Sequence, residues 1–76
     1  MSPTLGMKLR ALSDRIFEYE GHDPLVLWRK DQVLTVTGLV QHPGQPLEVL
    51  IDLDEKNWEA VPLPILDEYF APAVTH

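Results

Sequence analysis

Cysteine is absent from this chain of 76 residues, which also has only three histidines. The absence excludes disulfide bonds, and with them a disulfide-stapled secreted scaffold. It also leaves no zinc site of the usual cysteine and histidine type. Since a chain without disulfides suits a reducing compartment, the sequence predicts a cytoplasmic protein.

Long hydrophobic runs are also lacking, and none approaches the length of a membrane span. The first seven residues have no basic region followed by an apolar core, so we expect no signal peptide and no membrane partner. The length predicts a single domain over residues 1–76, with its core at about 7–70 and tails at 1–6 and 71–76. So short a chain forms a thin core, which favours a homo-oligomer.

Basic residues are scarce in the second half of the chain. Bases and acids balance up to residue 31, whereas from residue 32 onward Lys56 is the only base against seven acids. The whole net charge of −6 therefore lies in the second half. Nucleic-acid binding needs a basic footprint, so we expect no nucleic-acid partner. The acids serve either as a solvated surface or as a face for a basic protein partner.

No catalytic, metal or cofactor motif stands out. A catalytic histidine needs a partner residue beside it, and the sequence pairs none of the three histidines with one. The acids at positions 52, 54 and 55 surround a turn without the calcium-loop pattern. The pair Asp67–Glu68 suits a short helical turn or a solvated surface, and there is no glycine-rich phosphate loop. We therefore predict no catalytic residue, no metal and no cofactor.

The segment from residue 32 to residue 53 reads as a β-hairpin. Leu34 and Val36 alternate with Thr35 and Thr37. Further along, one face of a period-two pattern is shared by Leu47, Val49, Ile51 and Leu53. Between the two runs, residues 41–46 include two prolines and a glycine, which suit a chain reversal. A tight turn at 54–57 and a short strand at 58–61 follow.

The first segment allows two interpretations. Apolar residues between Leu5 and Tyr19 follow helical spacing, with Ser2 as a candidate N-cap and Gly21 as a stop. Met7, Leu9 and Ala11 also alternate, so a strand over 7–12 followed by a long loop fits the periodicity equally well.

The order of elements resembles an SH3-like small β-barrel over residues 9–70. The stretch Ala11-Leu-Ser-Asp14 matches the opening motif, residues 27–36 match the second strand, and residues 58–70 match the closing strand, proline, helical turn and final strand. The resemblance implies an all-β fold: a small SH3-like barrel of about five antiparallel strands, with a short helical turn before the last strand. It favours strand and loop for the first segment.

The groove that binds proline-rich peptides in SH3 domains matches this chain only in part. Ser13 stands where the opening motif of those domains has a tyrosine, and Pro46-Leu47 stands where their third strand begins with a tryptophan. Only Tyr69 and Pro62 match groove residues. Proline-rich ligands are therefore disfavoured, and bacterial barrels of this shape have varied partners, so the fold does not choose among them.

Two tryptophans, two tyrosines and two phenylalanines supply much of the apolar area. We expect Trp58 in the core and Trp28 at the surface, as part of an interaction patch. The rest of the predicted core consists of Leu34, Val36, Leu47 or Val49, and Ile51. The predicted partner-binding residues are Trp28, Tyr69, Glu48, Asp52 and Asp54.

The favoured function is a small non-enzymatic protein–protein interaction module that binds through an aromatic or acidic surface. One alternative is a multi-subunit enzyme resembling the type II dihydrofolate reductases, although Trp58-Glu-Ala-Val-Pro62 differs from their Val-Gln-x-Tyr stretch. The other is an acidic mimic of nucleic acid, or an inhibitor, that occupies a basic groove.

Overall fold

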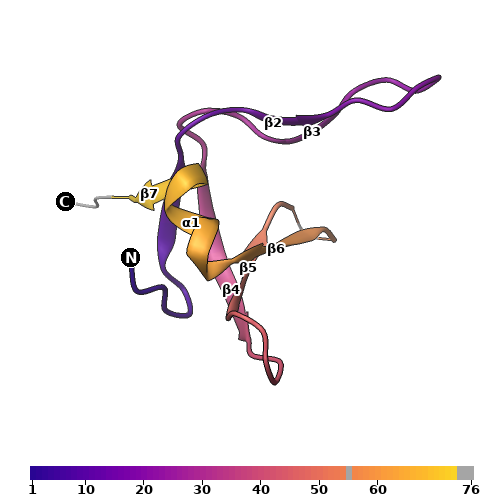
Figure 1. Ribbon diagram of the computed structural model, residues 1–76. Coiled ribbons are helices and arrows are strands. Elements are labelled where there is room, and N and C mark those ends of the chain that lie inside the picture. Colours follow the sequence, from indigo (N-terminus) through magenta and orange to yellow (C-terminus); the bar gives the residue numbers. More distant parts are fainter. Residues whose placement is uncertain (55, 74–76) are drawn as a thin grey trace.

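The computed structural model describes residues 1–54 and 56–73 of the chain (Figure 1). Within these residues, seven strands and one short helix follow one another, and the helix stands immediately before the last strand. In chain order they are β1 (Lys8–Ala11), β2 (Arg15–Phe17), β3 (Leu25–Trp28), β4 (Val33–Val40), β5 (Glu48–Asp52), β6 (Trp58–Pro62), α1 (Leu63–Tyr69) and β7 (Phe70–Pro72).

The strands form a five-stranded sheet in the order β6-β5-β4-β1-β7 and a separate two-stranded sheet of β2 and β3. Every pair is antiparallel. The predicted class, a small all-β fold with about five antiparallel strands and a helical turn before the last, is confirmed. The hydrogen-bonded ladder ends at β6 on one side and at β7 on the other.

The first segment adopts the strand interpretation, and the helical alternative is wrong. Leu9 and Ala11 are buried in β1 and alternate with the more exposed Lys8 and Arg10. The alternation allows one face of β1 to join the core, whereas two residues of the helical pattern, Leu5 and Tyr19, lie exposed. Residues 15–28 then form the β2–β3 hairpin, which projects away from the five-stranded sheet (Figure 1).

The core lies on one face of the five-stranded sheet, under α1 and the end of β3. Its buried members include the predicted Leu34, Val36, Val49 and Ile51, while Leu47 is half-buried. The prediction for Trp58 is wrong: its side chain is 61% exposed. The register between β5 and β6 explains this exposure. Trp58 pairs with Asp52, on the solvent side of β5, whereas Val61 pairs with buried Val49.

The ordered chain extends beyond the core predicted for residues 7–70. At one end the N–H of Gly6 donates to the carbonyl of Val36 over 2.8 Å. At the other end β7 reaches Pro72, and the N–H of Ala73 donates to the carbonyl of Lys8. Residues 74–76 of the predicted tail lie outside the described residues.

Candidate functional site

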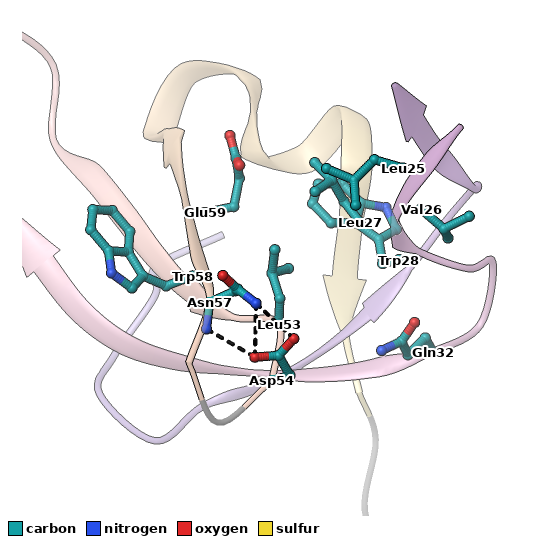
Figure 2. A pocket seen from close by; sticks show the side chains of 10 residues that line it. All are labelled: Leu25, Val26, Leu27, Trp28, Gln32, Leu53, Asp54, Asn57, Trp58 and Glu59. Atoms are coloured by element: carbon teal, nitrogen blue, oxygen red, sulfur yellow. Dashed lines mark hydrogen bonds between the residues drawn. The ribbon is translucent and has the colours of Figure 1, made fainter. Parts of the chain in front are cut away.

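A pocket of about 420 Å³ lies between β3 and the β5–β6 hairpin (Figure 2). One wall comes from β3 and the turn after it, and the other from the end of β5, the 54–57 turn and the start of β6. The lining residues are Leu25, Val26, Leu27, Trp28, Gln32, Leu53, Asp54, Asn57, Trp58 and Glu59. The pocket therefore has a mixed lining, with apolar side chains from β3 and Leu53 and polar groups from Gln32 and the β5–β6 hairpin.

The apolar side of the pocket follows from the run Leu25-Val-Leu-Trp28. These residues alternate along β3, so Leu25 and Leu27 lie on the same face. Leu53 extends β5 by one residue on the core side and packs against the core from the opposite wall. In Figure 2, Leu53 and Glu59 rise from the β5–β6 hairpin, with Leu27 and Trp28 opposite them and Trp58 turned to the other side.

Trp28 is 1% exposed, so the expectation that it lies at the surface is wrong. Its ring packs 4.8 Å from that of Phe70 and 6.2 Å from that of Tyr69, measured between centroids. Trp28 is buried because Tyr69 at the end of α1 and Phe70 at the start of β7 pack against it at the end of β3. Its indole N–H is buried without an acceptor among residues 1–54 and 56–73, which costs about 1–3 kcal/mol.

The 54–57 turn is held by the carboxylate of Asp54. Its Oδ1 accepts hydrogen bonds from the backbone N–H groups of Lys56 (2.8 Å) and Asn57 (2.9 Å), and its Oδ2 accepts one from Asn57 Nδ2 (2.9 Å). The hydrogen bond from the Asn57 side chain, followed by that from the Lys56 backbone, lowers the pKa of Asp54 below its usual value. Asp54 thus has a local partner for both oxygens and acts chiefly as a turn residue.

Glu59 is the acid of the pocket that remains available to a ligand. It pairs with Ile51, whose side chain is buried, so its own side chain lies on the core side of β6 at the pocket. The residue is half-buried, and its carboxylate has no hydrogen bond or ion pair with residues 1–54 or 56–73. A carboxylate that has no partner among these residues and lies beside apolar side chains favours a basic group of a ligand.

Tyr69 belongs to a neighbouring cluster around Arg15. The guanidinium of Arg15 lies 5.0 Å from the ring centroids of Phe17 and Tyr69 and 5.9 Å from that of Trp28. Its Nη1 also donates to the Tyr69 hydroxyl over 3.4 Å. These distances are typical of cation–π contacts, so the cluster fastens the root of the β2–β3 hairpin to the end of α1.

Comparison with known proteins finds no match. No protein-family model fits the chain, and neither a curated protein nor a solved structure is similar to it. The chemistry of the site therefore has to be argued from its own residues.

The predicted acidic residues differ in their surroundings. Glu48 and Asp52 lie on the solvent face of β5, as expected, with half-buried Leu50 between them. They are four residues apart, or about 13 Å along a strand. Asp52 pairs with Thr35, which accepts a hydrogen bond from Lys8 Nζ over 2.6 Å, so a base lies close to that acid. Glu59 faces the other side, and Glu55 lies outside the described residues.

Sequence reasoning missed Glu59 and Arg15 as site residues. Glu59 is not among the predicted binding residues, and its pairing with Ile51 rather than with Asp52 places it on the pocket side. The contact between Arg15 and Tyr69 joins residues 54 positions apart, so no local pattern indicates it.

Within residues 1–54 and 56–73, no three acids or histidines converge as metal ligands. No helix in these ranges has the length and apolarity to cross a membrane.

Proposed function

We propose that the chain is a small, non-enzymatic, cytoplasmic module that binds another protein through the pocket between β3 and the β5–β6 hairpin. The ligand is a basic side chain of that protein, and the carboxylate of Glu59 pairs with it. The single observation that carries the proposal concerns Glu59, a half-buried residue of the pocket lining. Its carboxylate has no hydrogen bond or ion pair with residues 1–54 or 56–73.

Both parts of a lysine or arginine side chain suit this pocket. The aliphatic stem would lie against Leu25, Leu27 and Leu53, and the charged end would reach Glu59. Exposed ion pairs contribute about 0.2–1 kcal/mol, whereas close, desolvated pairs at interfaces contribute more. For a half-buried carboxylate we expect about 1.4 kcal/mol, which is a tenfold change in affinity.

The SH3-like assignment remains part of this proposal. It is supported by the order of the elements, in which a long hairpin follows the first strand and a short helix precedes the last. The proposed ligand site differs from a groove for proline-rich peptides, because Tyr69 is engaged with Arg15 and lies outside the pocket lining.

Random peptides displayed on phage and selected on the immobilised protein test the proposal. We expect lysine and arginine to be enriched among the selected peptides. Selected peptides should bind Glu59→Gln about tenfold more weakly than the wild type. Glu68→Gln is the matched control, because Glu68 is an exposed acid of α1 outside the pocket lining. Equal binding to both variants would show that Glu59 does not select the ligand.

A further inference from the structure

We propose that the partner segment binds as an extended strand along the outer edge of β6, with its basic residue opposite Glu59. This inference rests on the proposed function and adds the backbone geometry of the ligand. β6 is an edge strand of the five-stranded sheet, and in the described part of the chain only β5 pairs with it.

The hydrogen bonds at both ends of β6 fix which of its backbone groups point outward. The N–H of Leu53 donates to the carbonyl of Asn57, and the N–H of Leu63 donates to the carbonyl of Leu47. The register between β5 and β6 has no shift, so the inward-bonding residues of β6 alternate with outward-pointing ones. The N–H and C=O groups of Trp58 and Ala60 therefore point away from β5.

This edge is short and has defined ends. Pro62 has no N–H, so an added ladder loses its donor there. At the other end the chain enters the turn closed by Asp54 and Asn57. Natural edge strands are commonly protected by charged side chains, by proline or by a bulge. In β6 the pairing is regular, so a bulge is absent, and Pro62 and Glu59 limit which strands can be added.

The two faces of β6 predict the side chains of the added strand. Trp58 is exposed on the solvent face, where an apolar neighbour on the ligand would cover its indole. Glu59 lies on the pocket face, where a lysine or arginine on the ligand would pair with it. Ala60 returns to the solvent face with a small side chain. An alternating apolar–basic–apolar segment fits this pattern.

Charge favours a basic partner segment over a second copy of this chain. The whole net charge of −6 lies in the half of the chain that contains β6, so two copies repel each other at this edge. If two β6 strands paired in antiparallel fashion about Ala60, Glu59 would lie opposite Val61 of the other copy and would gain no basic partner. Trp58 would then lie opposite Pro62, which donates no hydrogen bond.

The probe is the synthetic peptide acetyl-Thr-Val-Lys-Val-Thr-amide, titrated into the isotope-labelled full chain and followed by NMR. We expect the amide hydrogens of Trp58 and Ala60 to become protected from exchange as the peptide binds. A peptide with the same side chains but N-methylated at both valines lacks the ladder donors. It should bind at least about fivefold more weakly, because each lost hydrogen bond weakens binding several-fold.

The outcomes separate this inference from the proposed function. If both peptides bind equally and Glu59→Gln weakens both, the pocket binds the lysine but strand addition is wrong. If Glu59→Gln has no effect on either peptide, the proposed function is wrong. Protection of Trp58 and Ala60 without peptide, at concentrations where the chain sediments as a dimer, would assign the edge to a second copy and overturn the inference.

Discussion

The five-stranded sheet and the β2–β3 hairpin both contain strands rich in apolar residues, but they differ in what covers those residues. In the sheet, Leu34, Val36, Val49 and Ile51 are all buried. In the hairpin, the cross-strand pair Ile16 and Val26 is 41% and 38% exposed, and Leu25 on the other face is 50% exposed. Apolar residues in a strand are thus buried only where a further layer of structure covers them.

Among the described residues, the contacts that fix the hairpin lie at its root. There, Asp14 Oδ1 accepts a hydrogen bond from the N–H of Lys30 over 2.7 Å, and Arg15 packs among aromatic rings. Beyond the root it is a two-stranded ribbon, an arrangement that is marginally stable alone. Residues of the root should therefore contribute strongly to stability, and residues further out should contribute little.

The two tryptophans should give the largest contrast. Trp28→Ala removes a buried side chain from the root, and we expect a loss of about 3–5 kcal/mol. Trp58→Ala should change the free energy of unfolding by less than about 0.5 kcal/mol, as is usual for surface substitutions. Urea unfolding followed by circular dichroism measures both changes.

Trp28→Phe should lower the free energy of unfolding less than Trp28→Ala does. The phenylalanine keeps a ring and removes the indole N–H that has no acceptor among the described residues. Equal losses for the two alanine variants would contradict the assignment of the core.

The second contrast compares isoleucines of the two regions. Ile51→Ala in the sheet should cost about 2–5 kcal/mol, because Ile51 is fully buried and leaves a cavity. Ile16→Ala in the hairpin should cost about 1 kcal/mol or less, since a partly exposed side chain loses less contact with apolar neighbours. The same unfolding experiment measures both. A loss below about 0.5 kcal/mol for Ile51→Ala would mean that the register of β5 is wrong.

The two tryptophans also show which core residues can be predicted from the sequence alone and which cannot. Alternation identified β4 and β5 and four of their core residues, because a period of two is a local property. Whether Trp58 or Val61 faces the core depends on the number of residues in the 53–57 turn and on the register it sets. Trp28 is buried by Tyr69 and Phe70, more than forty residues away, and no local pattern contains that contact.

The exposed hairpin also predicts self-association in concentrated solution. Apolar side chains on both of its faces can be covered by the hairpin of a second copy. Sedimentation should then show species larger than the 8.7 kDa chain. Replacing Ile16 and Val26 by threonine should weaken the association about tenfold, through loss of about 1–2 kcal/mol of apolar burial. A single 8.7 kDa species at every concentration would show that the hairpin is not covered in this way, and would also remove the multi-subunit enzyme alternative.

The smallest expected effect concerns the turn that carries one wall of the pocket. Its hydrogen bonds, led by that from the Asn57 side chain, hold the pKa of Asp54 below its ordinary value of 3.8. A carboxyl group with a lowered pKa in the folded state contributes stability above its unfolded pKa and loses that contribution as pH falls through the folded pKa. The stability difference between the wild type and Asp54→Ala should therefore be constant from pH 7 down to about 5 and shrink below about 3.8. Asn57→Ala removes the leading donor, so the titration midpoint of Asp54, followed by carboxyl NMR, should rise. An unchanged midpoint would show that the pocket wall is held by other contacts.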